Sequence, residues 1–181
     1  PLCLVGSEMC IRDRYLINMT VLNILTFPDP RLRKVAAPVI KFDKSLKKLT
    51  EDMLETMYQG NGIGLAATQV NVHKRVIVID VSDDRTDPKI FINPEFEIKD
   101  NKSLFSFSEG CLSIPGYNEE ITRPDKILLK WQDVNGKFHE EEPEGILTVC
   151  IQHEIDHLEG KLMVDYISSL KRERIRSKLR K

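Results

Sequence analysis

The run QHEIDHL at residues 152–158 constrains this chain more than any other feature of its sequence. It contains an HExxH pattern, in which His153 and His157 stand four residues apart. On a helix both imidazoles leave the same face and can bind one metal ion. Glu154 follows the first histidine, close enough to handle a proton of water on that metal. The competing interpretation is a surface helix with two solvated histidines, because so short a pattern also occurs by chance.

The residues that precede the motif favour a buried helix. Five of them are apolar and surround the helix on almost every side. They are Ile146, Leu147, Val149, Cys150 and Ile151. Polar side chains in a buried helix need partners, and a metal ion would supply one. We therefore expect the site helix to cover about residues 145–159, with Gly160 placed to cap it.

Two histidines leave the metal short of ligands, and three residues compete for the third position. The extended pattern HExxHxxGxxH would need a histidine where Met163 stands. A glutamate further downstream would have to be Glu173, which is set among basic residues. Cys111, in the run EGCLS, is the better candidate because thiolate is a strong ligand for such a metal. Cys150 also competes, although its apolar neighbours suit a small buried side chain.

The chain has 181 residues, 41% of them hydrophobic and 30% charged, which is enough for one domain with a substantial core. Apolar residues at helical spacing predict an amphipathic helix over residues 45–59. β-Branched runs predict strands at residues 75–81 and 89–94, and residues 95–99 continue the sheet. We expect one catalytic domain over residues 19–166.

Asn135 and Gly136 separate two extended runs at residues 126–133 and 137–141, and this pair is a strong hairpin signal. His139 lies on that hairpin among glutamates, so we interpret it as a solvated residue rather than a ligand. His73, in the loop NVHK, is interpreted in the same way. The predicted class is α+β, with antiparallel strands and hairpins packed around a central metal-binding helix, followed by a C-terminal helix.

The run GIGLAATQ at residues 62–69 follows the first predicted helix. Its glycines allow the backbone to approach a ligand closely, and its small apolar residues suit burial, which leaves Gln69 as the conspicuous polar group. The alternative is a tight turn before a strand, with a glutamine placed there incidentally.

Residues 1–18 contain neither a secretion signal nor a membrane span. Residues 4–14 look like translated sequencing-adapter sequence, so we expect residues 1–18 to be a non-native extension and the natural protein to begin at Met19. Cys111 and Cys150 then remain as the cysteines to be explained. They imply no disulfide framework and fit a reducing cytoplasm.

Residues 167–181 form a basic segment, with seven lysines and arginines against one glutamate. This charge of +6 leaves −7 on the remainder of a chain whose net charge is −1. Ser168 is a plausible N-cap for a last helix with a narrow apolar stripe of Leu170, Ile175 and Leu179. Its basic face is either a solvated surface or a site for an anionic partner.

Three runs occur in order along the chain: GIGLAATQ, EGCLS and QHEIDH. Together they resemble the peptide deformylase family, which removes the formyl group from the N-terminal methionine of new bacterial proteins. The resemblance extends from about Val21 to the basic C-terminal helix. It implies a metal-dependent amidohydrolase that acts on N-formyl-methionyl nascent peptides. The other classes considered are a zinc peptidase of HExxH type and a non-catalytic metal-binding module.

The resemblance also assigns roles to matching residues. The metal ligands would be Cys111, His153 and His157. Glu154 would act as general base and acid, and Gln69 with the backbone N–H of Leu112 would stabilise the oxyanion. The peptide would lie beside Ile63, Gly64 and Gly110, and its methionine side chain would enter an apolar pocket. That pocket would include Ile146, Val149 and Cys150.

The metal and the partners are further expectations. One thiolate and two imidazoles favour Zn(II) by ligand type, whereas the resemblance implies Fe(II), with Zn(II), Ni(II) or Co(II) able to occupy the site. We follow the resemblance and expect Fe(II). We also expect a cytoplasmic monomer whose basic helix binds the ribosome near its exit tunnel.

Overall fold

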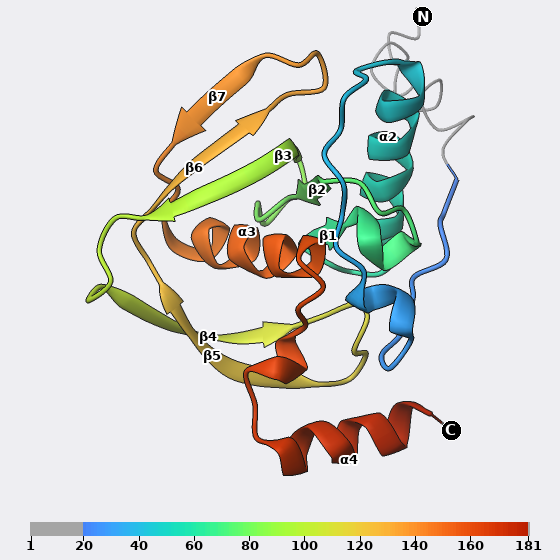
Figure 1. The fold of residues 1–181 in the computed structure, drawn as a ribbon, viewed down its shortest axis with the longest axis vertical. Coiled ribbons are helices and arrows are strands. Elements are labelled where there is room, and N and C mark those ends of the chain that lie inside the picture. The colour runs from blue at the N-terminus through green and yellow to red at the C-terminus, as the bar shows by residue number, and fades with distance from the viewer. Residues whose placement is uncertain (1–19, 181) are drawn as a thin grey trace, which may run out of the picture.

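The computed structural model describes residues 20–180. The expected non-native extension, residues 1–18, lies outside this range. Within it the chain forms an α+β fold with antiparallel sheets, as predicted (Figure 1). The α-helices are α2 (Lys44–Gln59), α3 (Gly145–Leu158) and α4 (Ser169–Leu179). Short 3-10 helices are η2 (Pro30–Arg33), η3 (Ala67–Val70) and η4 (Met163–Asp165).

The strands form two antiparallel sheets. One has five strands in the order β1-β2-β3-β6-β7, and the other pairs β4 with β5. The strands of the larger sheet are β1 (Gly64–Ala66), β2 (Val76–Ile79), β3 (Lys89–Ile98), β6 (Ile127–Gln132) and β7 (Phe138–Glu141). The smaller sheet consists of β4 (Leu104–Gly110) and β5 (Asn118–Pro124). The predicted strands at 75–81 and 89–94, the continuation at 95–99 and the hairpin around Asn135 are confirmed.

Helix α3 lies between the two sheets (Figure 1). Its apolar side chains, among them Ile151 and Ile155, pack against Ile77, Ile79 and Phe91 of the larger sheet. The predicted central helix is therefore confirmed. Toward the smaller sheet α3 buries polar side chains that have partners there, since His153 is hydrogen-bonded to Glu109 and Gln152 to the Pro124 carbonyl.

Helix α2 covers the opposite face of the same strands. Its residues Leu46, Met53 and Met57 pack with Val76 and Val78 of β2. Strand β2 is buried on both faces, which explains why its sequence VIVI is apolar without alternation. Strand β1 pairs with β2 and contacts both helices. The two helices thus hold the run GIGLAATQ in a defined position.

The β4–β5 hairpin was not predicted from the sequence. Most of its side chains are exposed, so its residues carry little hydrophobic alternation. The strands nevertheless pair over their full length, from Leu104 opposite Pro124 to Gly110 opposite Asn118. Cys111 is the first residue after β4. The hairpin therefore determines where the thiol of EGCLS lies.

Helix α4 confirms the predicted C-terminal helix. The Ser168 side chain accepts a hydrogen bond from the backbone N–H of Lys171 at 3.4 Å, as expected of an N-cap. Ile175 is only 2% exposed, whereas Leu170 is 63% exposed, so one position of the narrow stripe carries most of the packing. Among residues 20–180, no helix combines the length and the apolar character needed to cross a bilayer.

Asn93 fastens the N-terminal segment to the larger sheet, and its removal should weaken the fold. Its side chain accepts a hydrogen bond from Val39 N–H at 2.7 Å and donates to the Val39 carbonyl at 2.9 Å and to Gln132 Oε1 at 2.8 Å. Asn93 also adopts a positive φ of 52°, where β3 departs from regular pairing. We expect Asn93→Ala to lower the free energy of unfolding in urea by about 2–4 kcal/mol.

Asn93→Asp is the matched control for this prediction. Aspartate tolerates the positive φ and keeps the acceptor for Val39 N–H, so it should cost less than alanine. Equal losses for the two variants would show that the hydrogen bond from Val39 and the backbone conformation contribute nothing.

Candidate active site

Helix α3 presents both histidines of the HExxH pattern on one buried face. His153 is 7% exposed and His157 is fully buried, and their ring centroids lie 5.0 Å apart. Burial lowers the pKa of His157 well below its usual value, so this imidazole is neutral. Burial acts against protonation of His153 too, but hydrogen bonds with Cys111 and Glu109 raise its pKa.

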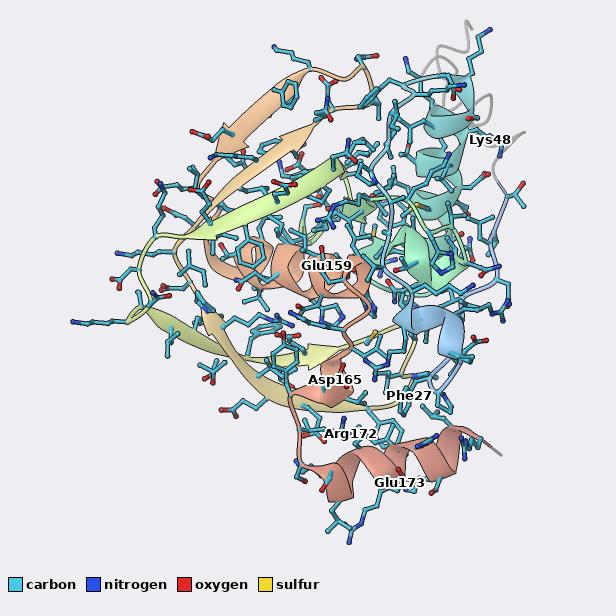
Figure 2. The ribbon with its side chains drawn as sticks, viewed as in Figure 1. Phe27, Lys48, Glu159, Asp165, Arg172 and Glu173 are labelled. Carbon is cyan, nitrogen blue, oxygen red and sulfur yellow. The ribbon has the colours of Figure 1, made fainter. Side chains whose placement is uncertain are left out.

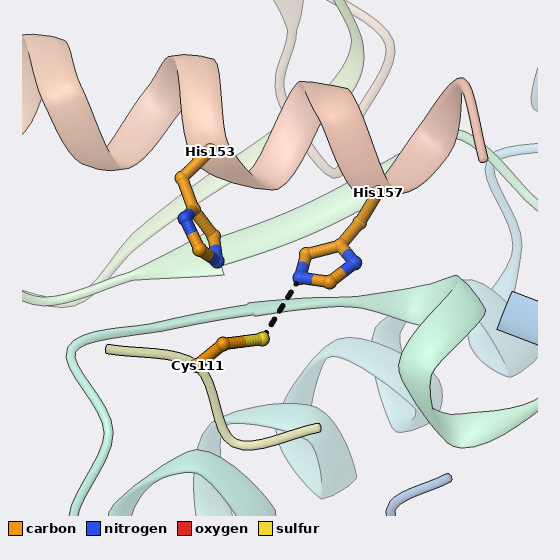
Figure 3. Close-up of side chains that lie close together, drawn as sticks. All are labelled: Cys111, His153 and His157. Carbon is orange, nitrogen blue, oxygen red and sulfur yellow. Dashed lines mark hydrogen bonds between the residues drawn. The ribbon is translucent and has the colours of Figure 1, made fainter. Parts of the chain in front are cut away.

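Cys111 approaches the histidines from the loop after β4 (Figure 3). Its Sγ atom lies 3.2 Å from His157 Nε2. One potential ligand atom from each of Cys111, His153 and His157 lies within 4.8 Å of the other two. No other group of three potential ligands in the described part of the chain meets this condition. A soft thiolate with two imidazoles suits a transition-metal ion such as Fe(II) or Zn(II).

The competing third ligands do not reach the histidines. Glu173 is an exposed residue of α4, away from α3 (Figure 2), and Met163, which stands where the extended motif needs a histidine, is a buried residue of an apolar cluster. The Sγ atom of Cys150 lies 3.8 Å from the carbonyl oxygen of Ile63. Burial raises the pKa of the Cys150 thiol, which disfavours the thiolate that binds metals. The Cys111 thiol therefore lies beside the histidines, whereas the Cys150 thiol lies against a backbone carbonyl.

Glu109 is a site residue to which the sequence analysis assigned no role. His153 Nδ1 donates a hydrogen bond to Glu109 Oε2 at 2.7 Å, so Nε2 is the ring nitrogen that can bind a metal ion. Burial opposes ionisation of Glu109, but hydrogen bonds from His153 and Arg123 lower its pKa. The only signal in the sequence was its place in EGCLS, because its contact with His153 depends on the unpredicted β4–β5 hairpin.

Glu154 and Gln69 lie beside the cysteine and the histidines. Glu154 is 4% exposed, and burial raises its pKa to about 7. Its Oε2 atom is buried and has no hydrogen-bond partner within residues 20–180. Gln69 accepts a hydrogen bond from Ala66 N–H at 2.8 Å through Oε1. Its Nε2 donates to Ser113 Oγ at 3.1 Å and lies 3.7 Å from Cys111 Sγ, so the amide is held in one orientation.

A cavity of about 420 Å³ opens beside these groups. It is lined by catalytic candidates, by two of the three metal-ligand candidates and by every substrate-binding residue suggested from the sequence. Those lining residues are Ile63, Gly64, Gln69, Gly110, Cys111, Leu112, Ile146, Val149, Cys150, His153 and Glu154. The sequence analysis missed Phe107 and Tyr117, which also line the cavity, because both belong to the β4–β5 hairpin region.

His73 and His139 lie outside this site. His73 Nε2 is hydrogen-bonded to the Arg31 carbonyl oxygen at 3.0 Å, and His139 Nε2 lies 3.1 Å from Asp133 Oδ2. The sequence analysis expected both to be solvated. In the structure both are half-buried, because local contacts cover part of each ring. His139 also stacks on Trp131, with ring centroids 5.3 Å apart.

The fold and the site together define a metal-dependent hydrolase. A sequence profile of the polypeptide deformylase family matches residues 21–173, and the chain therefore belongs to that family. Its activity is the hydrolytic removal of the formyl group from the N-terminal formyl-methionine of nascent polypeptides. This membership decides against a peptidase and against a non-catalytic module.

Several relatives show how far the similarity extends. The chain is 58% identical over 163 residues to a peptide deformylase of Stutzerimonas stutzeri, covering 90% of this chain and 96% of the relative. It is 60% identical to one of Cellvibrio japonicus, with the same coverage. The crystal structure of a peptide deformylase from Legionella pneumophila superposes with a TM-score of 0.82 at 45% identity, covering 89% of this chain and 94% of that one. The Ehrlichia chaffeensis enzyme in complex with actinonin gives 0.84 at 40% identity, covering 90% and 97%.

Gly64 cannot carry a side chain without disturbing the site. A Cβ atom there would lie 2.7 Å from Cys150 Sγ and closer still to Glu154 Oε1, and both belong to a buried helix that cannot withdraw. We expect Gly64→Ala to lower the rate of formate release from a formyl-methionyl peptide by about 100-fold.

Gly62→Ala is the matched control for Gly64→Ala. Its Cβ would meet the end of the flexible Leu112 side chain at 2.8 Å, so a smaller loss is expected. A Gly64→Ala enzyme as active as Gly62→Ala would show that Glu154 tolerates displacement.

Proposed function

We propose that Cys111, His153 and His157 hold the divalent metal ion with which this enzyme hydrolyses N-formyl groups. The observation that carries the proposal is the convergence of one sulfur and two imidazoles within 4.8 Å. The buried, unpartnered Oε2 of Glu154 within the described residues adds support, because such an atom needs a polar group beside it. When bound, a divalent metal acts as a Lewis acid and lowers the pKa of its water toward neutrality.

Glu154 moves the proton in this proposal. It accepts the proton of the attacking water and delivers it to the nitrogen of the leaving amine as the C–N bond to the formyl group breaks. Gln69 Nε2 and the backbone N–H of Leu112 donate hydrogen bonds to the formyl oxygen, which gains negative charge in the transition state. The hydrogen bonds of Gln69 to Ala66 and Ser113 support this role, since they fix the amide before substrate arrives.

The peptide binds between two strand edges. Strand β1 is the terminal strand of its sheet and β4 pairs with β5 alone, so each has one edge without a strand partner among residues 20–180. An extended peptide would bind along Ile63 and Gly64 on one side and Gly110 on the other. The methionine side chain enters the apolar part of the cavity formed by Ile146, Val149 and Cys150.

The native metal in this proposal is Fe(II), with Zn(II), Ni(II) or Co(II) able to replace it. The thiolate of Cys111 supports any of these ions over Mg²⁺ or Ca²⁺, which prefer oxygen ligands. Metal analysis of protein purified without oxygen tests the assignment. Zinc without iron in protein kept anaerobic from lysis onward would overturn it.

The two cysteines should differ in their effect on metal content. We expect Cys111→Ala to lose the metal and all measurable turnover, because it removes the only anionic ligand. Cys150→Ala should keep nearly normal metal content, since its thiol points toward the Ile63 carbonyl. Atomic absorption on the two purified variants measures the difference. The reverse result would mean that the ligand set is wrong.

Glu154→Gln should separate metal binding from catalysis. Glutamine keeps the shape of the side chain but cannot accept the proton, so turnover should fall by about 10²–10⁴-fold. Metal content should stay at one ion per chain. Retained formate release would remove Glu154 from the mechanism.

The proposed setting is the cytoplasm, where the enzyme acts as a monomer and α4 binds ribosomal RNA near the exit tunnel. Arg174 and Lys178 of α4 and Arg180, which caps its C-terminus, are exposed basic residues that form no ion pair within the part of the chain described here. Lys171 and Arg172, in contrast, pair with Glu119 and Asp165 at 2.7 and 3.5 Å. The first three are therefore the basic side chains that remain available to phosphates.

Changing Arg174, Lys178 and Arg180 to glutamine should weaken ribosome co-sedimentation and reduce its salt dependence. Turnover of a free peptide should not change, because α4 does not line the cavity. The matched control changes the exposed residues Lys41, Lys44 and Lys47 to glutamine, removing equal charge elsewhere. Equal loss of co-sedimentation in both variants would show that overall charge, and not α4, is responsible.

A further inference from the structure

Arg123 of β5 is a buried cation that the reaction described above does not use. It is 4% exposed. Its Nε donates to Glu109 Oε1 at 2.5 Å and its Nη2 to Glu109 Oε2 at 3.0 Å, so the guanidinium grips both carboxylate oxygens. Its Nη1 donates to Asp156 Oδ2 at 2.8 Å. Arg123 thereby joins the β4–β5 hairpin to α3.

Glu109 Oε2 is shared between Arg123 and His153. It accepts a hydrogen bond from Arg123 Nη2 and another, at 2.7 Å, from His153 Nδ1. The plane of the carboxylate is set by the guanidinium, and the carboxylate in turn sets the rotation of the imidazole. A carboxylate held by His153 alone would be free to rotate.

Two further residues, Asp156 and Tyr166, contact the Arg123 guanidinium. Asp156 stands on α3, three residues after His153, so Arg123 is anchored to the helix that carries both histidines. The Tyr166 hydroxyl donates to Asp156 Oδ2 at 2.7 Å, and the Tyr166 ring lies 5.0 Å from the Arg123 guanidinium carbon. Tyr166 follows η4, on the segment that leads to α4.

Attachment of the hairpin to α3 does not by itself require these charges. Buried ion pairs can often be replaced by well-packed apolar residues without loss of stability. What an apolar contact cannot do is accept the His153 Nδ1–H and hold the acceptor in one orientation. The arrangement therefore points to a role in the site rather than in folding alone.

We propose that Arg123 is a positioning residue for His153, acting through Glu109, and that Asp156 and Tyr166 hold Arg123 in place. This inference rests on the proposed role of His153 as a metal ligand. Its consequence is that the β5 strand and the segment after η4 control how firmly the metal is held, although neither contributes a ligand.

The test compares Arg123→Met with Arg75→Met in protein loaded with Co(II). Arg75 also pins α3 to a sheet, through Glu159 and the Pro94 carbonyl, but it does not touch Glu109. The readouts are the rate of Co(II) release to a chelator, the visible absorption spectrum of the bound Co(II) and the melting temperature. We expect Arg123→Met to release Co(II) about 10- to 100-fold faster and to alter the spectrum. Arg75→Met should lower the melting temperature alone.

Two milder variants keep the test decisive if Arg123→Met does not fold. Arg123→Lys retains the charge but cannot bind both carboxylate oxygens at once, and Tyr166→Phe deletes only the hydroxyl of a half-exposed side chain. Both variants should release Co(II) faster than the wild type, and the effect of Tyr166→Phe should be the smaller of the two. The proposal is overturned if the folded Arg123 variants release Co(II) at the wild-type rate, or no faster than Arg75→Met.

His153→Ala distinguishes this failure from failure of the proposed ligand set. If His153→Ala loses Co(II) while the Arg123 variants retain it normally, only the positioning role is wrong. If His153→Ala retains Co(II), then the ligand assignment itself is wrong, and the positioning role falls with it.

Discussion

One buried carboxylate, Glu109, holds the smaller sheet against α3 by accepting hydrogen bonds from both His153 and Arg123. A buried anion is costly unless it is paired, so this contact is stable only when hairpin and helix are together. Cys111 follows β4 two residues after Glu109. The segment that carries the hydrogen-bond acceptor for His153 therefore also carries the thiol to His157, and the site forms as a unit with the fold.

The other side of the site depends on β1. Helices α2 and α3 cover opposite faces of the strands beside it, so the backbone of the run GIGLAATQ has little freedom to move. This restraint allows Gly64 to lie against Glu154 and Cys150 with no room for a methyl group. It also fixes Gln69, whose amide is oriented by Ala66 and Ser113. Rigid surroundings of this kind suit a donor that must meet a short-lived charge.

Elements with a strong local pattern were predicted correctly from the sequence. The amphipathic pattern of α2, the uniformly apolar β2 and the Asn135–Gly136 turn are local signals, since each depends only on neighbours in the chain. The β4–β5 hairpin lacked such a signal because most of its side chains face solvent. Without the β4–β5 hairpin, no role could be assigned to Glu109, Arg123 or Phe107, because their partners are distant in sequence.

The spacing of His153 and His157 was determined by the sequence alone, because a helix places residues four apart on one face wherever it lies. The three ordered runs likewise sufficed for the family. The sequence already favoured Cys111 over Cys150 as the third ligand, but the position of its thiol needed the tertiary structure, because only the pairing of β4 with β5 brings it to 3.2 Å from His157. The orientation of His153 was decided there too, because its acceptor and the cation behind it come from strands that local patterns do not reveal.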